Sequence, residues 1–313
     1  MDVDAALRYA GRHELHVLIV ATPAAIVGEQ CGDGWTFAAP HALYSGTKSF
    51  WGVAAIAAAE DGLLHMDEPV VATIAEWDGD PQRAAMTIRQ LLNLTSGYGF
   101  GGLGMAVPTA AKAIATPLKH DPGTTFTYGG VPLQIFGEVL RRKLAPHATT
   151  PHVYLRERVL EPAGIGVDSW RTLRDGTHTF PTGAFLSAHA WLGYGRMLLA
   201  RGCAGETRIV RDSGVSECTA GSAQNARYGL GFWLDPLDDG SGIFYASGAG
   251  GQALYIIPEQ DAVVVHFGKS SSWQHAAFLR ALLAAPKLRK RGQRFVAAAH
   301  HSRTAAAVKE PSE

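Results

Sequence analysis

The sequence predicts an α+β fold, with an antiparallel sheet flanked by helices, built from both chain ends, and an inserted helical domain. Short β-branched segments occur near the N-terminus, and apolar segments separated by hairpin-length turns follow residue 226. Most of the chain between them has a helical pattern. We therefore expect a sheet domain from residues 1–65 and 226–285, a mainly helical domain from 66–225, a cleft between the two, and a basic, poorly ordered tail over 286–313.

The composition indicates a substantial core and no strongly charged partner. The chain has 313 residues, 47% of them hydrophobic, and its 28 basic and 28 acidic side chains leave no formal net charge. A neutral chain gives no electrostatic reason to expect nucleic acid or an anionic membrane as partner. A small neutral substrate fits this composition better, and the sequence leaves the oligomeric state open.

Neither a metal nor another cofactor is expected. The cysteines Cys31, Cys203 and Cys218 are odd in number and lack C-x-x-C spacing, so they indicate neither a disulfide framework nor a zinc site. The 13 histidines show no H-E-x-x-H or comparable ligand spacing. The glycine-rich stretch 99–104 lacks a phosphate-binding lysine, and we interpret it as a flexible loop near the cleft.

The N-terminal segment favours a cytoplasmic protein. Met1-Asp2-Val3-Asp4 is acidic, whereas a signal peptide begins with basic residues. No apolar run approaches the roughly 18 residues of a membrane span. We expect a cytoplasmic location, with no signal peptide in this chain and no membrane partner.

The first 65 residues are expected to start the sheet and then to form one enclosed helix. Their patterns predict a short helix over 5–13 and strands over 15–21, 24–28 and 35–37. The alanine-rich stretch 49–60 follows, and its residues 50–59 carry no charged side chain. A helix without a polar face is normally surrounded by protein. Gly62 is a typical residue for the end of such a helix.

The rest of the chain is expected to be helical up to residue 225 and then to form strands. Apolar residues at helical spacing predict helices over 84–92, 131–144, 151–160 and 188–200. Apolar runs separated by turn residues predict an antiparallel meander over 228–234, 242–246, 252–257 and 262–267. A last helix over 273–284 is expected to cover this meander.

The most informative local pattern is Ser45-x-x-Lys48 at the start of the enclosed helix. Residues three apart share a helix face, so the lysine amine and the serine hydroxyl can touch. A serine hydroxyl needs a neighbouring base to become nucleophilic, and a lysine becomes a base when burial penalises its ammonium form. The alternative interpretation is that Ser45 is only an N-cap residue, a position that serine often occupies.

Tyr128 lies in a loop before the helix predicted over 131–144, where Pro132 falls in the first turn. Its position at a helix N-terminus parallels that of Ser45. A buried tyrosine more often serves packing or a single hydrogen bond. Tyr128 is therefore a candidate catalytic residue only in combination with the other patterns.

Several stretches together resemble the serine hydrolases of the β-lactamase and penicillin-binding fold, in the branch with class C β-lactamases, esterases, D-aminopeptidases and 6-aminohexanoate-dimer hydrolases. They are LYSGTKSF at 43–50, TIRQLLNLTSG at 87–97, PGTTFTY at 122–128, the segment 185–199, and YGLGFW at 228–233. Their order and spacing match this family over roughly residues 40–268. The resemblance implies a β-lactamase/transpeptidase-like architecture.

The resemblance also implies a role for each matching residue. Ser45 would form an acyl-enzyme, and Lys48 would help to deprotonate the Ser45 hydroxyl. Tyr128 would carry a proton to the leaving group. The backbone N–H groups of Ser45 and Ala249 would form the oxyanion hole. The remaining positions that match the family's substrate-binding motifs are Gly130, Ser247 and Gly248.

The chain departs from the family's penicillin-recognising members at two positions. Gly130 stands where those members carry the asparagine of Y-x-N, and Ala246 stands where they carry a lysine or histidine. Neither residue can replace a polar or charged hydrogen-bonding side chain. The sequence therefore predicts an esterase-like serine hydrolase that cleaves a small ester or amide, rather than an efficient β-lactamase.

Other functions stay open at this point. One alternative is a β-lactamase or D-amino-acid peptidase, and another is a non-catalytic ligand-binding protein that keeps the fold but has lost polar groups of the site. An α/β-hydrolase is disfavoured because the sequence contains no G-x-S-x-G elbow.

Overall fold

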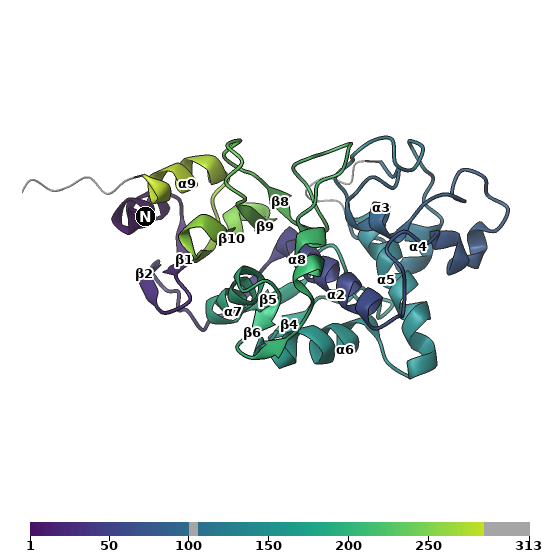
Figure 1. The fold of residues 1–313 in the computed structure, drawn as a ribbon, viewed down its shortest axis with the longest axis horizontal. Helices are drawn as coiled ribbons and strands as arrows, with labels where there is room; N and C mark the ends of the chain where they lie inside the picture. The colour runs from purple at the N-terminus through teal and green to yellow at the C-terminus, as the bar shows by residue number, and fades with distance from the viewer. Residues whose placement is uncertain (100–105, 285–313) are drawn as a thin grey trace, which may run out of the picture.

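The computed structural model describes residues 1–99 and 106–284. The tail predicted over 286–313 and all but Gly99 of the loop predicted over 99–104 lie outside the described residues. The predicted α+β fold is confirmed. Strands from both ends of the chain form one sheet, and helices lie on its two faces and extend away from it (Figure 1).

The main sheet is antiparallel and has the strand order β2-β1-β11-β10-β9-β8 in the described residues. Its strands are β1 (Leu15–Ala21), β2 (Ile26–Cys31), β8 (Trp233–Leu234), β9 (Phe244–Gly248), β10 (Gln252–Ile257) and β11 (Ala262–Gly268). Nearly all residues of β1, β10 and β11 are buried, because helices cover both faces of the sheet. This explains why these strands read as continuous apolar runs.

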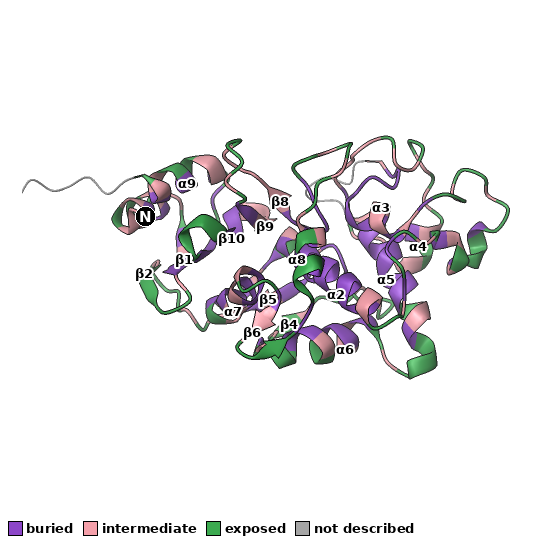
Figure 2. Ribbon diagram, in the orientation of Figure 1, coloured by how far each residue is buried: buried purple, intermediate pink, exposed green. Residues whose placement is uncertain are grey.

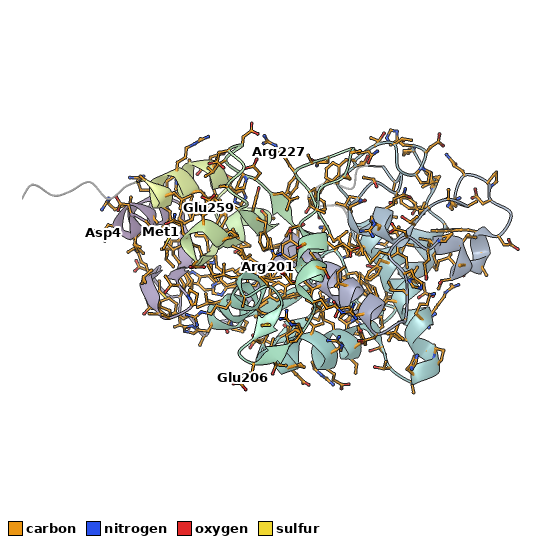
Figure 3. The ribbon with its side chains drawn as sticks, in the orientation of Figure 1. Met1, Asp4, Arg201, Glu206, Arg227 and Glu259 are labelled. Carbon is orange, nitrogen blue, oxygen red and sulfur yellow. The ribbon has the colours of Figure 1, made fainter. Side chains whose placement is uncertain are left out.

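Helices α1 (Val3–Ala10) and α9 (His275–Leu283) pack against each other and cover one face of the sheet. Met1 and Asp4 lie at this end of the molecule (Figure 3). Helix α7 (Ala188–Leu199) packs against β10 and β11 from the other face, although its residues fall within the range 66–225. Its apolar side chains, among them Trp191 and Leu198, are buried there.

Helix α2 (Lys48–Glu60) runs through the middle of the molecule, and all of its residues from Lys48 to Ala58 are buried (Figure 2). The enclosed helix expected over 49–60 is therefore present. The other helices are α3 (Ile88–Leu92), α4 (Ala110–Ile114), α5 (Val131–Leu144), α6 (Pro151–Leu155) and α8 (Asp212–Cys218). Of these, α3, α4 and α5 lie at the end of the molecule opposite to α1 and α9 (Figure 1).

Short elements complete the described part of the chain. Small strands are β3 (His41–Ala42), β4 (Ser169–Trp170) and β5 (Ala184–Leu186), which form one sheet, and β6 (Cys203–Ala204) and β7 (Thr207–Arg208), which form another. Single-turn 3₁₀ segments are η1 (Tyr44–Thr47), η2 (Val70–Ala72), η3 (Ala75–Trp77), η4 (Ala145–His147), η6 (Glu161–Ala163), η7 (Ala249–Gly251) and η8 (Pro258–Gln260). No helix in the described ranges is long and apolar enough to cross a membrane.

Several expected elements differ from the observed ones. The strand expected over 35–37 is wrong: Trp35 instead stacks on the His16 ring, with the ring centroids 3.8 Å apart. The helix expected over 84–92 begins only after Thr87, which caps α3. The helix expected over 151–160 is α-helical only as far as Leu155 and continues as a π-helix, η5 (Arg156–Leu160).

Buried histidines predict that the fold loses stability in mild acid. Burial, the largest cause in each case, lowers the pKa of His152 and His266 to about 3 and that of His275 to about 4. Because the unfolded chain binds these protons near pH 6.5, lowering the pH from about 6.5 towards 4 favours unfolding. Each histidine should contribute a slope of up to about 1.4 kcal/mol per pH unit. Urea unfolding at pH 7, 6 and 5 measures this slope, and a free energy of unfolding that is independent of pH over this range would contradict the expectation.

Candidate functional site

Ser45 lies in η1, the 3₁₀ segment that runs directly into α2. Lys48 is the first residue of α2. This junction places the Lys48 Nζ atom 3.0 Å from the Ser45 Oγ atom. Only 3% of Lys48 is exposed, whereas Ser45 is half-buried. The two side chains predicted to touch therefore do so, with the amine enclosed and the hydroxyl at the border of a cavity.

The surroundings of the Lys48 amine are polar but contain no acidic partner in the described part of the chain. Its second hydrogen bond goes to the backbone oxygen of Pro181, at 3.1 Å. The ring centroid of Tyr128 lies 4.8 Å from Nζ, so the amine also borders the face of the phenol ring. Two neutral oxygen atoms and one aromatic ring thus hold this amine in place.

Tyr128 also lines the cavity, and it lies in the loop that leads to the N-cap residue Gly130 of α5. Its ring stacks on Trp233 with centroids 5.5 Å apart, and it meets the edge of Tyr228 at 6.0 Å. These contacts restrain the ring on two sides. The side-chain amide that Y-x-N motifs provide is replaced at Gly130 by a hydrogen atom.

Strand β9, which lies next to the edge strand β8, brings backbone amides beside Ser45. A Cβ atom built on Gly248 would lie 2.1 Å from the backbone oxygen of Leu43, so this close approach requires glycine. Ala249 follows at the start of η7. Among residues 1–99 and 106–284, the backbone N–H groups of Ser45 and Ala249 donate to no protein acceptor. Both amides are therefore available to a bound oxygen atom.

All the residues singled out from the sequence line one cavity of about 1000 Å³, namely Ser45, Lys48, Tyr128, Gly130, Ser247, Gly248 and Ala249. Much of the remaining wall is aromatic or apolar, with Tyr44, Tyr98, Val107, Pro108, Trp233 and Tyr245 among its residues. Ala246 is fully buried and belongs to the core. The side chain at this position is therefore a methyl group packed into the core, and it offers no cation to the cavity.

Two contributors to the site were missed from the sequence. The Pro181 oxygen that holds Lys48 is a backbone atom 133 residues away, and backbone atoms leave no motif. His275 lies on α9 and lines the cavity, where its Nε2 atom is 3.2 Å from the Ser247 Oγ atom. The sequence predicts that His275 lies in a helix over 273–284, but it does not show which residue of that helix faces the end of β9. A role for His275 in the site was therefore not predictable from the sequence.

Comparisons with known proteins agree with this architecture. The sequence pattern of the Beta-lactamase family matches residues 17–287. A search of curated proteins found no match. Many solved structures are similar, and three of them illustrate the range.

The octameric penicillin-binding protein homologue from Pyrococcus abyssi is 19% identical, with a TM-score of 0.71 over 90% of this chain and 77% of that chain. EstCE1, a hydrolase with promiscuous acyltransferase activity, is 14% identical, with a TM-score of 0.70 over 89% of this chain and 95% of that chain. A beta-lactamase from Mycobacterium bovis is 20% identical, with a TM-score of 0.65 over 89% of this chain and 98% of that chain.

At these identities the solved structures establish the fold alone. The family match covers most of the chain, and it includes each of the segments whose motifs carry the resemblance noted in the sequence. That resemblance is therefore confirmed, and the chain belongs to the Beta-lactamase family, a family of hydrolases.

Proposed function

We propose that the protein is a serine hydrolase that cleaves a small ester or amide through an acyl-enzyme on Ser45, and that it acts as an esterase rather than as an efficient β-lactamase. The observation that carries this proposal is the 3.0 Å contact between the Lys48 amine and the Ser45 hydroxyl at the wall of the cavity. Contacts of this length are those expected between a nucleophile and its base.

In the first step, Lys48 takes the proton of Ser45 as the Oγ atom attacks the substrate carbonyl carbon. An amine that lies 3.0 Å from the hydroxyl and has no acidic partner in the described residues suits this step. The carbonyl oxygen becomes an oxyanion, to which the free N–H groups of Ser45 and Ala249 donate. These backbone donors are held by η1 and η7 and require no rearrangement during the reaction.

In the second step, the bond between the carbonyl carbon and the leaving group breaks, and Tyr128 carries a proton to the departing oxygen or nitrogen atom. The phenolate then takes a proton from the Lys48 ammonium, and for this the Tyr128 oxygen must turn to the amine, because Nζ lies over the face of the ring, 4.8 Å from its centroid, and in the described residues donates to Ser45 and Pro181. Water then loses a proton to the same pair of residues as its oxygen attacks the acyl carbon, and the bond between that carbon and Ser45 Oγ breaks as Oγ takes the proton back. The cycle returns Ser45 and Lys48 to their starting protonation states.

The wall of the cavity supports a substrate that is small and largely apolar. Its aromatic residues offer contact surface for an acyl chain or an aromatic leaving group, including Tyr98, Trp233 and Tyr245. A hydrolase with promiscuous acyltransferase activity, a D-stereospecific amidohydrolase and a beta-lactamase are found among the similar structures, so the fold is compatible with each of these activities.

Intact-protein mass spectrometry tests the proposal directly. After mixing with a panel of p-nitrophenyl esters and anilides, the protein should gain the mass of the acyl group, and peptide mapping should place that group on Ser45. An adduct on another residue would contradict the assignment of Ser45. No adduct and no turnover with any member of the panel would favour the non-catalytic ligand-binding alternative.

Comparison of two substrate classes tests the preference for esters. We expect p-nitrophenyl butyrate to be hydrolysed at least about 100-fold faster, in kcat/KM, than the β-lactam nitrocefin, because Ala246 and Gly130 offer no group to the β-lactam carboxylate and amide. A spectrophotometric assay of both compounds measures the ratio. Efficient nitrocefin turnover would instead support the β-lactamase alternative, and turnover of peptides with a C-terminal D-residue would support the peptidase.

A further inference from the structure

A chain of hydrogen bonds runs from the start of α9 to the wall of the cavity. The Trp273 Nε1 atom lies 3.0 Å from the Tyr255 Oη atom, which lies 2.6 Å from the His275 Nδ1 atom. The His275 Nε2 atom lies 3.2 Å from the Ser247 Oγ atom. Trp273 and Tyr255 are buried at one end of this chain, while His275 and Ser247 line the cavity at the other.

The direction of each bond follows from the chemistry of the donors. An indole N–H can only donate, so the Tyr255 oxygen accepts from Trp273. The hydroxyl hydrogen of the buried Tyr255 then needs an acceptor of its own, and His275 Nδ1 is the one in reach. Nδ1 therefore accepts, which leaves the ring proton on Nε2. Burial lowers the pKa of His275 to about 4, so the ring carries a single proton at neutral pH.

This direction determines what Ser247 can do. His275 Nε2–H donates to the Ser247 Oγ atom, so the Ser247 hydroxyl hydrogen is left to donate elsewhere. No other acceptor for this hydroxyl is present in the described residues, and Ser247 borders the cavity. The free donor is therefore available to a molecule bound in the cavity.

We propose that His275 is a positioning residue, which through its bond to Ser247 holds the Ser247 hydroxyl as a hydrogen-bond donor to an acceptor oxygen of the substrate. The inference rests on the proposed function, because it concerns the binding of that hydrolase's substrate. The proposal gives α9 a role in substrate binding. Trp273, Tyr255 and His275 contact no reacting atom and act only through the Ser247 hydroxyl.

Kinetics of a double-mutant cycle test this dependence. With an ester that the enzyme hydrolyses, S247A and H275A should each lower kcat/KM by about tenfold, the effect of losing one hydrogen bond to the substrate. The double variant S247A/H275A should be no slower than S247A alone, because His275 acts only through Ser247. Losses that multiply in the double variant, or an unchanged H275A, would overturn the proposal.

Two further variants separate positioning from mere packing. H275Q places an amide donor near the position of Nε2 and should recover part of the activity that H275A loses. H13A is the matched control, since His13 also bonds a serine, with its Nδ1 atom 3.1 Å from the Ser272 Oγ atom, but does not line the cavity. Activity unchanged in H13A and partly restored in H275Q is expected. Equal losses in H13A and H275A would show that the kinetics report only the docking of α9.

The tautomer provides a readout that is independent of catalysis. Long-range ¹H–¹⁵N spectra of the full chain at pH 7, with the His275 signals assigned by their loss in H275Q, should show Nε2 protonated and Nδ1 not. A proton on Nδ1, or a doubly protonated ring, would overturn the proposal. If the wild-type protein forms no acyl-enzyme, the proposed function fails first. If it does form one but the tautomer or the cycle disagrees, only the role of His275 fails.

Discussion

Replacement of Ser45 by alanine should lower kcat/KM for every ester and amide substrate by more than about 10⁴-fold, because among the described wall residues Ser45 carries the only hydroxyl group that is hydrogen-bonded to a lysine amine. The fold should be retained, since Ser45 is half-buried and its hydroxyl bonds only to Lys48 in the described residues. Steady-state kinetics and labelling with a fluorophosphonate probe measure the two consequences. Labelling of S45A equal to that of the wild type would remove Ser45 from the mechanism.

The matched control for this variant is S49A. Ser49 lies in the first turn of α2, shortly after Ser45, but its hydroxyl donates to the Gly46 backbone oxygen at 2.8 Å, away from the cavity. The substitution removes one buried hydrogen bond and should cost about 1 kcal/mol of folding stability. Probe labelling and kcat should stay near those of the wild type, which shows that the loss in S45A is chemical rather than structural.

Replacement of Lys48 by methionine should lower kcat by about 10² to 10⁴-fold, the range expected for loss of a general base. The methionine side chain has a similar length and suits a buried position, but it leaves the Pro181 oxygen without its donor. Stability should therefore change by only about 1 to 3 kcal/mol. Stopped-flow measurement of the acylation step, together with thermal unfolding, separates the chemical effect from the structural one.

Lys143→Met serves as the matched control for K48M. Lys143 pairs with Glu68 at 2.7 Å, is partly exposed, and does not line the cavity. An ion pair of this kind contributes little to stability, and its loss should leave kcat unchanged. If K48M acylates as fast as K143M does, Lys48 is not the base, and the proton of Ser45 must leave by another route.

The fold was predictable where the local pattern and the tertiary environment agree. The apolar runs at 252–257 and 262–267 became β10 and β11 because both of their faces are covered. The strand expected over 228–234 was reduced to β8 (Trp233–Leu234), because Gly231 turns at φ +87° and its Cα lies against the backbone oxygen of Lys48. That contact joins segments far apart in the sequence, which a local pattern cannot reveal.

The start of the helix expected over 84–92 could have been predicted correctly from the sequence. Thr87 and Gln90 form a capping box, in which each side chain accepts from the backbone N–H of the other residue, and this box sets the start of α3. Attention to the Thr-x-x-Gln spacing would have moved the predicted start from residue 84 to residue 88.

The candidate site divides in the same way. Ser45 and Lys48 were predictable together, because a helix alone brings them into contact. Tyr128, Ser247 and Ala249 could be suggested only through the family resemblance, since each comes from a different element. His275 has neither kind of signal, because its function depends on how α9 packs over the end of β9. A role that arises from packing between distant elements can be recognised only from the three-dimensional structure.

The pairing of β1 with β11 has a consequence for biosynthesis. The first strand can pair at once with β2, but its second partner, β11, is present only when residues near 262–268 have emerged from the ribosome, and α9 follows later still. Ser45 and Lys48 are translated early, but the wall that faces them is not finished until the last described helix has docked. A nascent or truncated chain ending before His275 would thus contain its nucleophile yet be unable to complete the groove that receives the substrate.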